Sequence, residues 1–136
     1  MENRDVIRAQ SAHTRMVRKA EDPEKYKLDN RRNSMREIAR RKSYVHPDLD
    51  PAAEMKLYAD AQARTKETGE LWEIDHIIPL IVGGSHHHLN LQILPCSINR
   101  SKSADPFWER SGYKSWRDVP QYLWPDKLKP AYQALL

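Results

Sequence analysis

The chain is short of the residues that brace small proteins through disulfides or zinc. It has a single cysteine, Cys96, in 136 residues, which excludes an intramolecular disulfide framework and any Cys-x-x-Cys zinc site. Long apolar runs are also missing: the N-terminus has no apolar core of the kind that a signal peptide requires, and no stretch approaches membrane-spanning length. We therefore expect a cytoplasmic protein without a membrane partner.

Positive charge is scarce outside the first third of the chain. Residues 1–43 carry 13 Lys and Arg against 7 Asp and Glu, whereas residues 70–136 carry 7 of each. Five of the nine arginines in this segment lie in its last third, at Arg31, Arg32, Arg36, Arg40 and Arg41. A basic arm that faces a polyanion and a basic but merely solvated helix both explain this pattern.

The first half of the chain favours helices. The pattern predicts helices over residues 3–20 and 23–43. These helices have too little apolar surface to be stabilised by burial alone. We therefore expect this region either to lie across the rest of the protein or to stay partly disordered until it binds a partner. The signal over 51–68 is stronger, because Asp50 is a good N-cap and Gly69 a good stop. Its expected inner face consists of Met55, Tyr58, Ala59 and Gln62.

The second half predicts a hairpin followed by a short helix. "ELWEIDHI" and "LNLQIL" read as strands, separated by the loop "IPLIVGGSHHH", and "CSINRSKSA" reads as a helix. Residues 105–136 form a tail rich in proline and aromatics, which we expect to pack against the body as irregular short helices rather than to stack on bases. The predicted fold class is α+β.

The predicted hairpin and helix carry a specific set of polar residues. Asp75 and His76 end the first strand, Asn90 begins the second, and Asn99 and Lys102 lie in the helix. A helix folded across the hairpin brings Asp75, His76 and Asn99 together. Carboxylate and amide oxygens suit Mg²⁺ or Mn²⁺, and a neutral histidine can take a proton from an attacking water. One metal and one base form a minimal set for phosphodiester hydrolysis.

The pattern "DHIIPL…GG…NLQIL…NRSK" resembles the HNH endonuclease motif. It is similar to the HNH domain of RNA-guided CRISPR nucleases and to small stand-alone HNH endonucleases of phages, over about residues 65–103. The resemblance implies a ββα-metal (His-Me finger) core in residues 51–104, with a basic helical, DNA-contacting arm in 1–50 and a packing segment in 105–136. The location implied is a bacterial or phage-infected cell.

The resemblance also implies a role for each matching residue. Asp75 would bind one Mg²⁺ or Mn²⁺, and Asn99 would be the second ligand, which makes the chain an H-N-N variant. His76 would be the general base. Asn90 would tie down the loop between the strands, and Lys102 would hold the DNA phosphate. Arg100 and five arginines of the N-terminal arm (Arg31, Arg32, Arg36, Arg40 and Arg41) would also contact DNA phosphates.

The chain departs from the family pattern in two ways. The cysteines that brace many relatives would stand at Pro95 and Ile98, so no structural zinc is expected and packing of the tail and the 51–68 helix must brace the core. Strand alternation also points Asp75 and His76 to opposite faces. Both can serve one site only if the strand is already ending there.

The other histidines carry weaker expectations. His86 and His87 are expected to be exposed loop residues and His88 to pack toward the hairpin, while His13 and His46 have no nameable partner. The expected function is a metal-dependent HNH endonuclease that nicks or cuts DNA, alone, as a homodimer or in a larger phage assembly. The alternatives are a non-catalytic nucleic-acid-binding protein on a degenerate HNH scaffold and a nuclease subunit active only inside a phage machine.

Overall fold

The computed structural model describes the backbone of residues 2–41 and 45–136 and the side chains of residues 8–34 and 45–136. In this part of the chain, five α-helices accompany one two-stranded antiparallel sheet, which confirms the predicted α+β class. The elements are α1 (Glu2–Glu21), α2 (Pro23–Arg41), α3 (Pro51–Thr68), β1 (Trp72–His76), β2 (Leu91–Pro95), α4 (Cys96–Lys102) and α5 (Lys129–Ala134).

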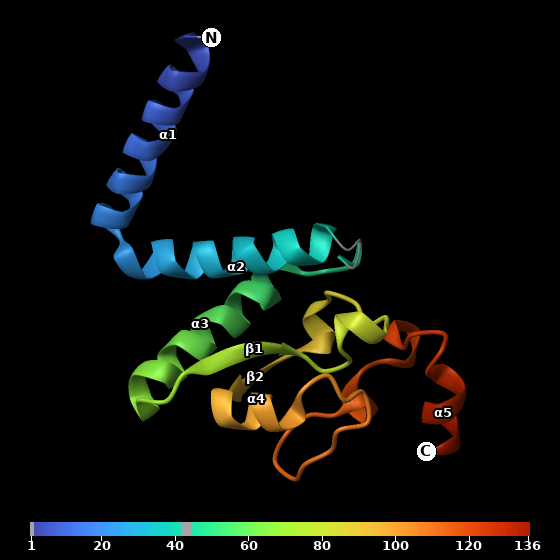
Figure 1. Cartoon of the computed structure of the whole chain (residues 1–136). Coiled ribbons are helices and arrows are strands. Elements are labelled where there is room, and N and C mark those ends of the chain that lie inside the picture. The colour runs from blue at the N-terminus through green and yellow to red at the C-terminus, as the bar shows by residue number, and fades with distance from the viewer. Residues whose placement is uncertain (1, 42–44) are drawn as a thin grey trace.

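The hairpin of β1 and β2 lies at the centre of the second half of the chain. Its register pairs Trp72 with Pro95 and His76 with Leu91. Both α3 and α4 contact both strands, and Figure 1 shows the two helices on opposite faces of the hairpin. Alternate side chains of β1 therefore point toward different helices.

The ends of α3 follow from local chemistry. The Asp50 side chain accepts a hydrogen bond of 2.9 Å from the Ala52 N–H, and Gly69 adopts a left-handed conformation with φ 75° that ends the helix. The predicted range 51–68 is confirmed.

The inner face of α3 differs from the prediction. Glu54, Tyr58 and Ala61 are buried, whereas the expected Ala59 is exposed. Glu54 lies four residues before Tyr58 and so on the same face of the helix, but an acidic side chain is seldom buried and its type gave no sign of this position. The burial of Glu54 becomes important at the functional site.

The loop between the strands makes a close backbone approach. A Cβ at Gly84 would lie 1.9 Å from the carbonyl oxygen of Ile78, so only glycine fits there. The 3₁₀ turn Leu80–Val82 lies in the predicted loop, whereas the second turn, His88–Asn90, includes Leu89 and Asn90, which were predicted to begin the second strand. That strand begins instead at Leu91.

The C-terminal tail supplies five of the seven buried residues of one apolar cluster. Trp116 and Tyr132 stack with ring centroids 4.2 Å apart, and Trp124 packs edge-on against both. These rings bury Ile77 and Ile78, which directly follow β1. The predicted packing role of the tail is confirmed, and the tail holds the end of β1 in place.

The two N-terminal helices are arranged differently from each other. The described side chains of α1 are exposed, and Figure 1 shows this helix projecting away from the rest. In contrast, α2 packs on α3, where Glu24 pairs with Lys66 at 2.8 Å and accepts a hydrogen bond from Gln62. The expected draping therefore applies to α2. None of the described helices combines the length and apolar character needed to cross a bilayer.

Candidate active site

The carboxylate of Asp75 faces α4. Its Oδ2 lies 3.3 Å from Lys102 Nζ and accepts a hydrogen bond of 3.0 Å from Gln92. Burial raises the pKa of Asp75, and the neighbouring ammonium acts in the opposite direction. Both contacts use the same oxygen, which leaves Oδ1 as the oxygen that a cation could approach.

The imidazole of His76 faces the other side of β1. Its Nε2 lies 2.9 Å from Nδ1 of His86. Burial, followed by positive charge at His86 and Lys102, lowers the pKa of His76 to about 3. The ring is therefore neutral at pH 7, which is the form that accepts a proton.

Asp75 and His76 border one pocket although they face different elements. The pocket has a volume of about 260 Å³, and its other lining residues are Ile74, Pro79, Leu80, Ile81, Ser103 and Ala104. The strand ends at His76, and the Ile77 N–H already bonds the carbonyl of Asn90 outside the regular ladder. The end of the strand thus lets two alternating side chains reach the same space.

Asn99 contacts β1 through Glu73, a residue that was not predicted to belong to the site. Its Nδ2 donates a hydrogen bond of 2.7 Å to Oε2 of Glu73, not to Asp75. Glu73 lies on the same face of β1 as Asp75, and its charge helps to raise the pKa of Asp75. Asn99 does not line the pocket that Asp75 and His76 share.

The donor set suits a hard divalent cation in its chemistry. Glu73 and Asp75 offer carboxylate oxygens and Asn99 an amide oxygen, which are the ligands that Mg²⁺ and Mn²⁺ prefer. In the part of the chain that the structure describes, no three His, Cys, Asp or Glu side chains are already gathered as a metal cluster. Two carboxylates supplemented by an amide therefore form the candidate ligands.

Asn90 ties the loop to the end of β1. Its Oδ1 accepts a hydrogen bond of 2.8 Å from the Ile78 N–H, and its Nδ2 donates to the carbonyls of Ile78 and Ser85. The side chain is buried and all three bonds go to backbone groups. The geometry matches the loop-holding role that the family resemblance implies for this residue.

Lys102, which was predicted to hold a DNA phosphate, is buried inside the protein. Its side chain is 1% exposed, and its ammonium donates to the carbonyl of His76 at 3.1 Å besides pairing with Asp75. An ammonium held inside the protein is not placed to hold a DNA phosphate, and Lys102 instead clamps the end of β1. Arg100, two residues earlier in α4, is exposed.

The predicted exposure of His86 and His87 is wrong. His86 is 0% exposed and His87 is 1% exposed. His87 accepts from the Leu89 N–H through Nδ1 and stacks on His88, and burial lowers the pKa of His87 to about 4. His46, for which no partner was predicted, packs edge-on against His87. His86 and His87 therefore belong to the interior of the loop, whereas His88 is half-buried.

Compared with protein-family models, with curated proteins and with solved structures, the chain gives no match. The candidate site therefore has to be interpreted from its own geometry and from the motif resemblance.

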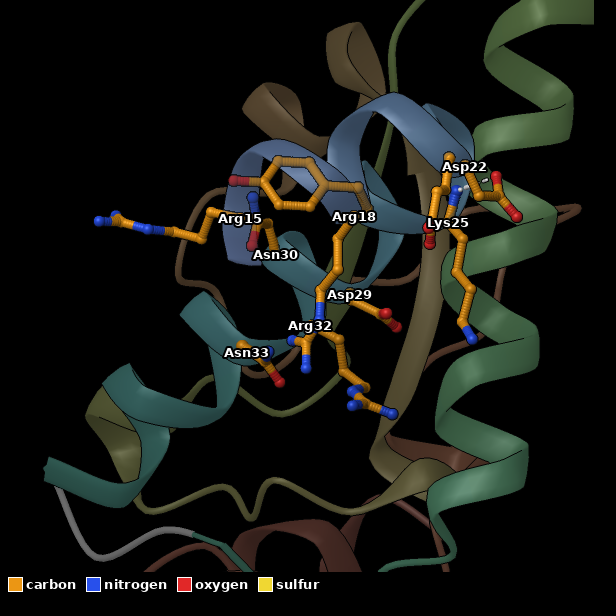
Figure 2. Close-up of a pocket in the computed structure, with 10 residues that line it drawn as sticks. Arg15, Arg18, Asp22, Lys25, Asp29, Asn30, Arg32 and Asn33 are labelled. Carbon is orange, nitrogen blue, oxygen red and sulfur yellow. Dashed lines mark hydrogen bonds between the residues drawn. The ribbon is translucent and has the colours of Figure 1, made fainter. Parts of the chain in front are cut away.

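A groove between α1 and α2 gathers part of the basic arm. It has a volume of about 580 Å³, and its charged lining residues are Arg15, Arg18, Lys25 and Arg32 together with Glu21, Asp22 and Asp29. Figure 2 shows the side chain of Arg18, from α1, pointing toward that of Arg32, from α2. Arg31 is exposed on α2, and the side chains of Arg36, Arg40 and Arg41 lie outside the described residues.

The roles of Glu73, Glu54 and His86 around the site were not predicted from the sequence. Glu73 could have been found, because alternation along a strand puts it on the face of Asp75. Glu54 carried a weaker signal as a carboxylate one helical turn from Tyr58. The partnership of His86 with Glu54 spans 32 positions and had no local signal.

Proposed function

We propose that this chain is a metal-dependent HNH endonuclease that hydrolyses phosphodiester bonds of DNA. The observation that carries the proposal is the pocket at the end of β1, which Asp75 and His76 border together. A buried acid and a neutral imidazole at one opening are the two kinds of group that metal-assisted hydrolysis requires. The proposed core is the ββα-metal arrangement of β1, β2 and α4.

Each residue has a defined task in this proposal. Asp75, with Asn99 and the newly found Glu73, would hold one Mg²⁺ or Mn²⁺, which supplies charge stabilisation at the phosphate and at the leaving oxygen. His76 accepts the proton of the attacking water. Lys102 keeps the backbone of His76 and the carboxylate of Asp75 in position.

The basic arm supplies affinity for the duplex. Arg18 and Arg32 both line the groove of Figure 2, and several positive charges along one groove favour an anion there. Three acidic residues also line this groove, so we expect a few backbone contacts there and not a continuous track. Exposed Arg31 and Arg100 extend the same role.

One observation favours a rival function. The Lys102 ammonium already pairs with Asp75, so the buried carboxylate has a cation without any metal. A non-catalytic nucleic-acid-binding protein on a degenerate scaffold would need nothing more. The two functions differ in whether DNA is cut.

The test is incubation of supercoiled plasmid with the protein and Mn²⁺ or Mg²⁺, with and without EDTA. The proposal predicts nicked or linear product that EDTA abolishes. His76→Ala should lower the cleavage rate by at least about 100-fold, as expected for loss of a general base, whereas the exposed-histidine control His13→Ala should cleave like the parent. Binding without cleavage by the parent protein would support the rival.

A further inference from the structure

Three side chains, from α3, from the loop between the strands and from β1, form a chain of contacts that ends at the proposed base. Oε2 of Glu54, on α3, lies 2.6 Å from Nε2 of His86, and Nδ1 of His86 lies 2.9 Å from Nε2 of His76. Glu54 and His86 are both 0% exposed, and His76 is half-buried at the pocket. No role in the proposed nuclease has so far been given to Glu54 or His86.

We propose that Glu54 and His86 are positioning residues that hold His76 in the one tautomer able to accept a proton from water at the pocket. This inference rests on the proposed function, because it concerns the base of that reaction. It assigns the basic nitrogen of His76 to Nδ1.

The assignment follows from which atoms can donate. An ionised carboxylate only accepts hydrogen bonds, so the proton in the Glu54–His86 contact is on Nε2 of His86. In the neutral ring Nδ1 of His86 then carries a lone pair, and so the proton in the next contact is on Nε2 of His76. The remaining nitrogen of His76, Nδ1, has the lone pair that a general base needs.

The contribution of these contacts is to the orientation of the ring and not to its charge. When His76 takes a proton at Nδ1, Nε2 still donates to His86, so the contact that orients the ring is kept. Burial and the Lys102 ammonium disfavour a positive His76 ring.

The backbone around His86 restricts its position. Val45 and His86 form a parallel bridge, and the His46 N–H donates to the His86 carbonyl at 3.2 Å. Both contacts come from a segment far from the loop in sequence. The imidazole of His86 is therefore held at its backbone as well as at both ring nitrogens.

Packing alone is a poor explanation for these residues. Glu54 lies on the inner face of α3 beside Tyr58 and Ala61, where an aliphatic side chain would fill the space without the desolvation cost of a carboxylate. Glu54 bonds His86, and His86 in turn bonds His76. Such a hydrogen-bonded series fixes the tautomer of a functional histidine ring.

Two amide variants of His86 separate the role of each ring nitrogen. His86→Asn places an amide oxygen near the position of Nδ1, where it accepts from His76, whereas His86→Gln extends its amide toward Glu54 and leaves His76 unsupported. We expect kcat for duplex cleavage to fall on the order of 10- to 100-fold in His86→Gln and His86→Ala, with partial rescue in His86→Asn. KM should change little, because no variant touches the DNA contacts.

A structural role predicts a different ranking. If His86 only fills the loop, cleavage should follow thermal stability, and the two amide variants should fall together when their melting temperatures match. Equal kcat values for His86→Asn and His86→Gln at matched stability would overturn the inference, as would parent-like cleavage by His86→Ala.

A second measurement needs no activity. Imidazole ¹H–¹⁵N correlation spectra of the full chain at neutral pH report which ring nitrogen of His76 carries the proton. We expect the proton on Nε2 in the parent and in His86→Asn, and a mixture of tautomers in His86→Ala. A parent ring protonated at Nδ1 would overturn the inference even in an active nuclease. An inactive parent would instead overturn the proposed function, while the spectra still decide the positioning.

Discussion

At the residue scale, the account depends on two side chains that end the same strand and face opposite helices. Asp75 is held by Lys102 and Gln92, and His76 is held by His86. Each is therefore fixed by a partner on its own side of the sheet before any ligand arrives. Such fixed groups cost little reorganisation during a reaction, which is how enzymes gain most from electrostatic interactions.

Substitution of Lys102 tests whether the Asp75 carboxylate can bind a divalent cation. Lys102→Met removes the ammonium beside a carboxylate that is 11% exposed, and we expect it to destabilise the fold by roughly 3 kcal/mol. Added Mn²⁺ should raise the melting temperature of this variant more than that of the parent, because the metal ion takes the place of the ammonium.

The control for that measurement is the double variant Lys102→Met with Asp75→Asn, which removes the charge that would bind the ion. It should gain no more from Mn²⁺ than the parent gains. Equal shifts in all three proteins would mean that the carboxylate does not bind the metal, and would favour the non-catalytic rival.

At the scale of elements, the loop between β1 and β2 sets the shape of the site. Asn90 bonds the backbone on both sides of this loop, and Gly84 allows the chain to cross within contact distance of Ile78. The histidine that supports His76 lies in the same loop. An error in the path of the loop would therefore displace the base.

Gly84→Ala should be among the most damaging single changes in the hairpin. The added methyl would meet the Ile78 carbonyl oxygen at 1.9 Å, so the backbone must move, and we expect a loss of more than about 3 kcal/mol in the free energy of unfolding. Gly112→Ala is the control: its φ of 91° strains an alanine, but nothing lies within 4 Å of the new Cβ. Similar unfolding free energies for the two variants would show that the close approach is not decisive.

Local chemistry explains which elements could be predicted from the sequence. Asp50 and Gly69 mark the ends of α3 through contacts with their own neighbours, and the turn residues of the loop mark the ends of the strands. The burial of His86 depends on Glu54 and Val45, which lie far away in the sequence. Three adjacent histidines after two glycines carry no sign of those contacts.

In the candidate site, too, the local features could be predicted from the sequence and the tertiary contacts could not. Asp75 and His76 could be placed at a strand end from the sequence, and the structure puts them at one pocket. The bond of Asn99 to Glu73 and the burial of Lys102 depend on how α4 lies across the hairpin. That docking angle is a tertiary property which the pattern of residues does not contain.

At the scale of the whole molecule, the groove that gathers part of the positive charge and the pocket at the end of β1 lie on different elements, although Arg31 of α2 lines a pocket together with Glu73. The pocket at the end of β1 belongs to the hairpin, whereas the groove of Figure 2 lies between α1 and α2. Of these two helices α2 packs on α3, so the arm meets the core through that interface. A duplex bound by the arm would be anchored independently of the reacting phosphate.

Loss of Arg18 and Arg32 should weaken duplex binding without changing the candidate site. Alanine at both positions should reduce the slope of log K against log salt by about 1 for each arginine, equally for unrelated DNA sequences. Arg110→Ala, an exposed arginine in the C-terminal segment, is the matched control. An unchanged salt slope in the double variant would remove the groove from the DNA-binding surface.

The most direct test of the central claim is to map where a divalent ion binds. Mn²⁺ titrated into ¹⁵N-labelled protein broadens the amide signals nearest to it. The account predicts that broadening begins around Glu73–His76 and Asn99–Ser103 and that Asp75→Asn abolishes it. Broadening that begins instead at the acidic residues between α1 and α2, with the end of β1 unaffected, would contradict the account.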